Sequence, residues 1–243
     1  MRRPFFASFV LPNVKAVTVT LVIVMQLLCL SKLQAEPVKV DAVEAEMIAD
    51  VDAIVPGQAF TIGLRLRHDS GWHTYWSNPG DSGLPTQFKL TMPKQFSAGD
   101  IAWPRPSRFL IPPLANLGYD REVLLTRVVT VPPDLAGRSV TIDALAQWLV
   151  CREVCIPGET NLSLTLPVAA LGAAPREGSH AWFFKDAARQ VPVGPAQVTV
   201  ARRDKMLQIH VPIKLAAMAI GAGASTRRIE FFARDIETVR HAP

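Results

Sequence analysis

The chain that follows residue 35 is predicted to form an all-β fold, an antiparallel β-sandwich. Apolar side chains alternate with polar or small ones from Phe60 to Arg67. A period of two residues is typical of a strand that buries one face. Similar alternation occurs at 88–92, 123–131, 140–150 and 162–166, and turn-forming residues separate the runs, at 55–57, 78–81, 112–113 and 132–134. Several short strands with turn signals between them favour an antiparallel sandwich.

The first 35 residues have the pattern of a secretory signal peptide. Arg2, Arg3 and Lys15 precede an apolar run that begins at Ala16 and extends to Leu30, and Ala35 is a suitable small residue for cleavage before Glu36. This order of charge, apolar core and small residue predicts export to the periplasm and removal of the leader. The alternative is an uncleaved membrane anchor, although the apolar run is short for a spanning helix, which needs about 20 residues.

The net charge of the chain comes largely from this leader. The whole chain has 26 Lys and Arg residues against 21 Asp and Glu residues, and the leader holds four of the basic residues and no acid. The mature protein is therefore nearly balanced in charge. Nothing in it suggests the clustered basic face that a nucleic-acid-binding protein needs, so we expect no nucleic-acid partner.

The mature chain is expected to contain one full domain and part of another. We place the first domain at 36–168, a linker rich in small residues at 169–177, and a partial second domain at 178–243. The second segment begins with a predicted helix at 181–190, for which Ser179 is a possible N-cap. Strands are predicted after it at 198–201 and 206–211. This segment is small for an independent core, so we interpret it as an incomplete α+β domain.

Cys151 and Cys155 are the only cysteines outside the leader. An isolated pair in an exported protein is expected to form a disulfide, and the three residues between them suit a tight turn that joins two strand ends. A loop this short stabilises a fold by only about 2 kcal/mol, so the bond is a poor staple but a suitable exchange site. The residues alone do not decide whether the disulfide is a structural staple or an exchange site. We expect no cofactor or metal: a zinc site lacks further ligands near the pair, and copper binding with Met206 or His210 is the weaker alternative.

A second unusual stretch, Trp72–Thr86, begins with three aromatic residues in five positions and continues with turn formers. Such rings either form an exposed platform for a carbohydrate or pack beneath a rigid loop, and we favour packing. His68 and His73 have no third candidate ligand nearby in the sequence, so a shared metal is not the favoured interpretation.

Four motifs in this order resemble one family: Trp72–Thr86, Trp103–Pro106, Gly118–Val123 and Trp148–Gly158. Together they are similar to the N-terminal periplasmic domain of the thiol:disulfide interchange protein DsbD, and closest to its ScsB-type branch, over residues 38–168. The resemblance implies an immunoglobulin-like sandwich in which Cys151 and Cys155 are the redox pair. It also implies an active-site cap loop near 110–119, with Tyr119 as the candidate that shields the sulfurs.

In that family the pair receives electrons from a membrane domain through a thioredoxin-like module and then reduces periplasmic partners. The expected partners are therefore thioredoxin-like periplasmic proteins, together with a membrane electron-transfer domain encoded separately, since we expect the chain to be truncated before its own membrane domain. Two hypotheses remain. Either the protein exchanges disulfides, as a protein-disulfide reductase does, or it is a non-catalytic binding or structural module with an inert disulfide.

Overall fold

The computed structural model describes residues 36–192, 199–204, 206–210 and 231–234. The predicted leader lies outside these residues, so cleavage near Ala35 stays a prediction. In the part of the chain that the structure describes, no helix is long and apolar enough to cross a membrane.

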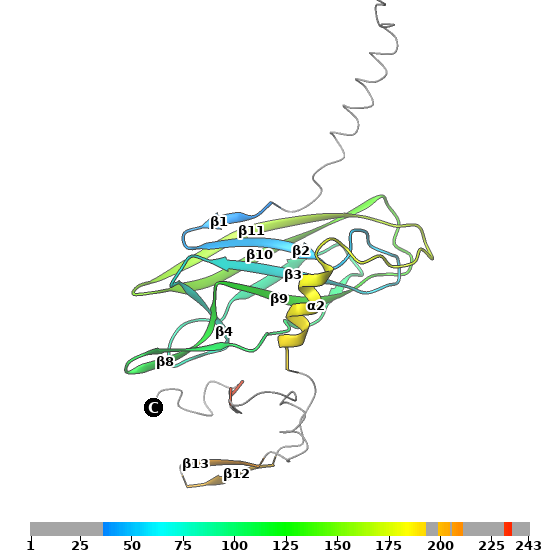
Figure 1. Cartoon of the computed structure of the whole chain (residues 1–243). Helices are drawn as coiled ribbons and strands as arrows, with labels where there is room; N and C mark the ends of the chain where they lie inside the picture. The colour runs from blue at the N-terminus through cyan, green and yellow to red at the C-terminus, as the bar shows by residue number, and fades with distance from the viewer. Residues whose placement is uncertain (1–35, 193–198, 205, 211–230, 235–243) are drawn as a thin grey trace, which may run out of the picture.

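Two antiparallel sheets make up the body of the protein (Figure 1). The first has the strand order β1 (Val38–Val40), β2 (Val43–Ala49), β3 (Phe60–His68), β9 (Glu122–Thr130) and β6 (Ser97–Ala98). The second has the order β11 (Cys155–Pro167), β10 (Ser139–Cys151), β4 (His73–Gly80), β8 (Leu114–Asp120) and β7 (Ser107–Ile111), and β5 (Gln87–Thr91) also pairs with β10.

The hydrophobic core lies between these two sheets. β3 contributes Ile62 and Leu64, which are fully buried, as the alternation of its sequence predicts. β10 contributes Ile142 and Trp148 from the opposite sheet by the same period of two. Each sheet thus buries one face against the other. The all-β prediction is confirmed, and the arrangement is the immunoglobulin-like sandwich that the sequence resemblance implied.

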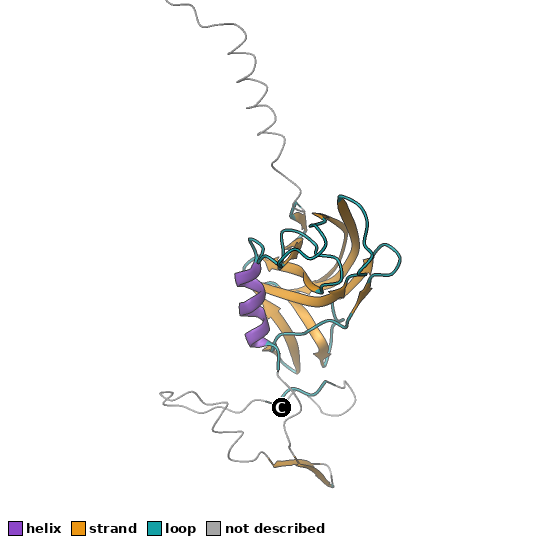
Figure 2. Cartoon of the chain, turned by 90° about the vertical axis from the view of Figure 1, so that its right-hand side faces the viewer, coloured by secondary structure: helices purple, strands orange, loops and turns teal. Residues whose placement is uncertain are grey.

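The helix α2 (Ala181–Gln190) packs on this sandwich (Figure 2), although we expected it to begin a separate segment. Its Phe184 and Ala187 form a small buried cluster with Ile48 of β2 and Leu124 of β9. These residues lie on the outer face of the first sheet. The apolar face of α2, which follows the boundary predicted after residue 168, is therefore buried against the sandwich, and the boundary itself stays a prediction.

Gly63 of β3 makes room for this contact. A β-carbon at residue 63 would lie 2.5 Å from Cδ1 of Leu124 and 3.2 Å from Cε1 of Phe184. The helix begins without the predicted cap: its N-cap residue is His180, with no side-chain cap hydrogen bond. Ser179 instead donates to Oδ1 of Asp52 from its backbone nitrogen, 3.0 Å away. This bond ties the start of the helix to the loop after β2.

Replacing Phe184 by alanine tests the docking of the helix. The side chain is only 6% exposed, so we expect Phe184→Ala to lower the free energy of unfolding by about 3 kcal/mol. Trp182, on the same helix but 66% exposed, is the matched control, and its replacement by alanine is expected to change stability by less than about 0.5 kcal/mol. Urea denaturation measures both values. Equal small effects would mean that the helix does not contribute to the core.

Two later parts of the described chain complete the fold. The strands expected at 198–201 and 206–211 correspond to β12 (Thr199–Arg203) and β13 (Met206–His210), which pair with each other. Residues 231–234 contact the sandwich, where the buried Asn78 side chain donates to the carbonyl of Ala233 over 2.8 Å. The ring of Phe232 also meets Trp76 edge-on, with centroids 6.2 Å apart.

Candidate redox site at the β10–β11 hairpin

The two cysteines lie at the tip of a long hairpin. β10 and β11 pair without a break from Ser139 opposite Pro167 to Cys151 opposite Cys155. The turn of three residues is closed by a hydrogen bond of 3.1 Å from the backbone nitrogen of Arg152 to the carbonyl of Val154. The register therefore brings the cysteine Cα atoms to 4.1 Å, and their sulfurs form a disulfide.

The two cysteines differ in their exposure to solvent. Cys151 is 2% exposed, whereas Cys155 is exposed, and the turn residues between them are exposed as well. A disulfide is opened by a thiolate that reaches one of its sulfurs. In this hairpin the exposed partner, Cys155, is the accessible side of the bond, and Cys151 is the covered side.

Tyr75 of β4 covers the disulfide from the neighbouring strand. β4 meets the end of β10 with His73 opposite Cys151, so His73 and Tyr75 share the face of the sheet from which Cys151 projects. The hydroxyl of Tyr75 donates to Sγ of Cys151 at 2.9 Å and lies 3.8 Å from Sγ of Cys155. Burial raises the pKa of Tyr75 above its ordinary value, which keeps the hydroxyl protonated as a donor.

His73 lies beside Tyr75 and is 4% exposed. Its ring stacks on Phe109 of β7, with centroids 4.4 Å apart and planes inclined by 15°. Its other neighbour is the ring of Tyr75, which it meets edge-on at 5.3 Å. The Nε2 atom of His73 is buried and has no hydrogen-bond partner among the described residues. Burial lowers the pKa of His73, and the charge of Asp120 opposes that shift.

The turn between the cysteines is held from one side by Trp72. The guanidinium carbon of Arg152 lies 5.3 Å from the centroid of the Trp72 ring, a cation–π distance. The structure places the Arg152 side chain over the indole.

Comparison with known proteins gives the family. The model of the family described as "Thiol:disulfide interchange protein DsbD, N-terminal" matches residues 39–167. The chain belongs to the DsbD N-terminal family. The matched residues fall within the first domain predicted at 36–168 and include both cysteines of the hairpin.

A solved structure shares the fold of this DsbD-family chain. It is the crystal structure of the N-terminal periplasmic domain of ScsB from Proteus mirabilis, with a TM-score of 0.52 and 22% sequence identity. The match covers 71% of this chain and 66% of that one, so the chain spans just under two thirds of the ScsB domain. A search of curated proteins found no match.

Tyr119, the shielding residue that the DsbD resemblance suggested, lies on the other face of the sheet. It pairs with Thr74, one residue out of phase with His73 and Tyr75, and its ring belongs to the core between the sheets. Its hydroxyl donates to the carbonyl of Pro104 at 2.7 Å. The structure thus brings Tyr75, not Tyr119, to the sulfurs. Sequence alternation shows that Tyr75 and Thr74 point to opposite faces of the sheet. Which of these faces carries the sulfurs depends on the pairing of β4 with β10, which the sequence does not show.

The aromatic stretch that begins at Trp72 is packed, as we favoured. Tyr75 is 1% exposed and Trp76 is 5% exposed, which leaves only Trp72 of the three aromatic rings partly accessible. This burial is unsuited to a carbohydrate platform, which presents ring faces to solvent. In the described ranges, no group of three or more His, Cys, Asp or Glu side chains is arranged so that it could hold a metal ion.

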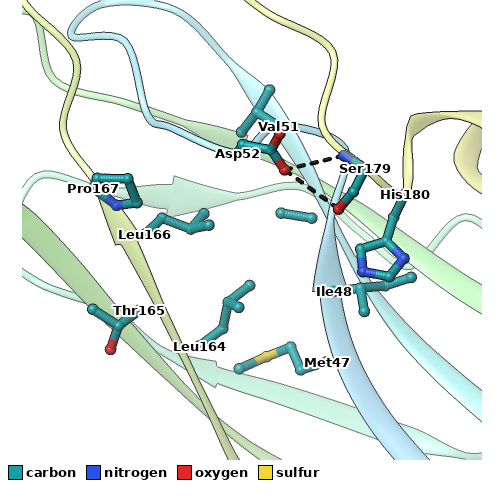
Figure 3. A pocket seen from close by; sticks show the side chains of 11 residues that line it. Met47, Ile48, Val51, Asp52, Leu164, Thr165, Leu166, Pro167, Ser179 and His180 are labelled. Atoms are coloured by element: carbon teal, nitrogen blue, oxygen red, sulfur yellow. Dashed lines mark hydrogen bonds between the residues drawn. The ribbon is translucent and has the colours of Figure 1, made fainter. Parts of the chain in front are cut away.

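A pocket away from the hairpin tip contains neither of the two cysteines (Figure 3). It lies between β2 and the end of β11, where Met47, Leu164 and Leu166 line it. Because β11 begins at Cys155, the pocket is at the opposite end of that strand from the disulfide. The carboxylate of Asp52 beside it is bound by Ser179. The hairpin tip is therefore the better candidate for the functional site.

Proposed function

We propose that this protein carries out thiol–disulfide exchange in the periplasm, and that Cys151 and Cys155 pass electrons to or from thioredoxin-like partner proteins. The observation that carries the proposal is the unequal exposure of the two cysteines. Cys155 is exposed at a hairpin tip, while Cys151 is buried and accepts a hydrogen bond from Tyr75. Membership of the DsbD family supports the same chemistry.

The exchange begins at the exposed sulfur. A partner thiolate attacks Sγ of Cys155, the bond between the two cysteines breaks, and its electron pair stays on Sγ of Cys151 as a thiolate. The hydroxyl of Tyr75 already points at that atom and stabilises the new charge. The partner's second thiolate then attacks the partner sulfur in the mixed disulfide and releases Cys155. The partner leaves as a disulfide, and this pair becomes a dithiol.

Exposed apolar side chains near the hairpin tip suit a protein partner. Val154, in the turn itself, is 63% exposed. Leu110 and Ile111 follow Phe109 in β7, the residue that stacks on His73, and are 63% and 41% exposed. Grouped apolar side chains at a surface are typical of interaction sites. We infer that a partner docks across the turn and the end of β7.

The cellular location and the limits of the redox domain are part of the same proposal. The similar ScsB structure is a periplasmic domain, and the leader predicted at 1–35 provides a route for export. We assign the redox domain to residues 36–168, with α2 packed on it. Electrons would reach the pair from a membrane electron-transfer domain.

The reduction potential of the disulfide tests this function. We expect the wild-type bond to equilibrate with a glutathione redox buffer, with a potential above about −300 mV, because structural disulfides lie below that value. Gel-shift alkylation after equilibration measures the reduced fraction. A bond that stays oxidised across the buffer series would support the inert-disulfide alternative.

A further inference from the structure

His73 is a buried basic group that the exchange steps above do not use. It faces Cys151 across β4 and β10, in directly opposed positions of the register. Side chains opposed in this way have β-carbons about 4.5–5.5 Å apart and project from the same face. The imidazole contacts the rings of Phe109 and Tyr75, and its Nε2 atom has no hydrogen-bond partner in the described structure.

The covered position of Cys151 creates a need for such a base. When Cys155 carries a mixed disulfide with a partner, Cys151 resolves it, and only a thiolate attacks a disulfide efficiently. Cys151 is 2% exposed, so solvent has little access to accept its proton, and the neighbouring Tyr75 hydroxyl donates to the sulfur rather than accepting from it. A neutral imidazole at the opposed position on β4 can accept the proton of this thiol.

We propose that His73 accepts the proton of the Cys151 thiol and so makes Cys151 the resolving thiolate. In this step the thiol proton moves to the imidazole, and the thiolate attacks Sγ of Cys155. The bond from Cys155 to the partner breaks, and its electron pair leaves on the partner sulfur. The imidazolium then returns its proton to that sulfur or to water. The inference rests on the proposed exchange function, because it concerns the resolution step.

The surrounding charges suit this role. Asp120, opposite His73 on β8, favours the protonated imidazole, while burial favours the neutral form more strongly. His68, at the end of β3, is itself kept neutral at pH 7, because burial lowers its pKa to about 4. β7 contributes the apolar ring of Phe109, and the cysteine turn contributes Arg152, which lies over Trp72. His73 is thus neutral at pH 7 in the oxidised protein and free to take up a proton.

The test measures how fast Cys151 forms the disulfide with Cys155 after a chemical probe has modified Cys155. Reaction of the reduced protein with 5,5′-dithiobis(2-nitrobenzoate) places thionitrobenzoate on the accessible Cys155, and attack by Cys151 then releases a second thionitrobenzoate whose absorbance is followed by stopped flow. In the wild type, the closure rate should rise as pH increases through the titration of His73 and then level off. His73→Phe, which keeps an aromatic ring beside Phe109 and Tyr75, should close at least about 100-fold more slowly at pH 7. Its rate should rise only at the higher pH where the thiol ionises unaided.

His68→Gln is the matched control, because His68 is a second partly buried histidine that does not face Cys151, and its closure profile should follow the wild type. A His73→Phe profile that also follows the wild type would overturn the proposal.

NMR titration of wild-type His73 needs no variant. The pKa of His73 should be higher after reduction with dithiothreitol than in the disulfide form, and an identical pKa in both forms would equally overturn the proposal. Both measurements use small reagents, so they give an answer even if no protein partner exchanges with the pair.

Discussion

Cys151→Ala is expected to accumulate a stable mixed disulfide with an oxidised thioredoxin-like protein, whereas Cys155→Ala accumulates little. The exposed Cys155 can reach the partner's disulfide, and removal of Cys151 leaves no second cysteine outside the leader to resolve the adduct. In Cys155→Ala the remaining thiol is 2% exposed and lies beneath Tyr75, so its attack should be slower by several orders of magnitude. Non-reducing gel electrophoresis measures the trapped species.

The variant that lacks both cysteines controls for non-covalent association and should give no adduct. The reverse pattern, with adduct confined to Cys155→Ala, would exchange the roles of the two cysteines and show that the hairpin opens before exchange. No adduct in either single variant would refute the redox proposal and leave a stapled binding module.

Gly118→Ala is expected to destabilise the protein by more than about 4 kcal/mol, a loss in the range that points to a specific steric cause. Gly118 lies on β8 opposite Tyr75, and a β-carbon there would be 1.9 Å from the carbonyl oxygen of Thr74 in β4. Since two non-bonded heavy atoms do not approach that closely, β4 and β8 must separate. That separation also displaces Tyr75 from Cys151, so surviving folded protein should show a more reactive disulfide.

Gly99→Ala is the matched control for this substitution. The nearest atom to a β-carbon at residue 99 is the carbonyl oxygen of Val128 at 3.8 Å, an ordinary van der Waals contact. Chemical denaturation of both variants gives the comparison. If Gly118→Ala is as stable as Gly99→Ala, the close approach of β4 and β8 at the site is not as the structure describes.

Local sequence patterns predicted the elements of this fold well, because strand alternation and the cysteine spacing depend on neighbouring residues. The run that begins at Phe60 formed β3 with its apolar side inward, and the residues between Cys151 and Cys155 formed the expected turn. The docking of α2 was not predicted because its surface combines outward-facing residues of different strands, such as Gly63 of β3 and Leu124 of β9, whose pairing a single sequence does not supply.

The environment of the disulfide was harder to predict, because it depends on which distant strands pair. Tyr75 and His73 precede Cys151 by more than 70 residues, and they reach it only because β4 lies between β10 and β8. The choice of Tyr119 followed from its position in a family motif. One step of register decides whether a tyrosine in these strands faces the sulfurs or the core, and a single sequence does not supply that register.

The unbroken pairing of β10 with β11 bears on how a partner tells the two redox states apart. The disulfide joins only the last pair of the ladder, and a loop of this size contributes about 2 kcal/mol, so opening the bond leaves the remaining cross-strand hydrogen bonds in place. The oxidised and reduced proteins should then present nearly the same outline. Under the proposed exchange function, a partner would then distinguish the two states by their reactivity rather than by shape, and the direction of exchange would follow the relative concentrations of electron donors and acceptors.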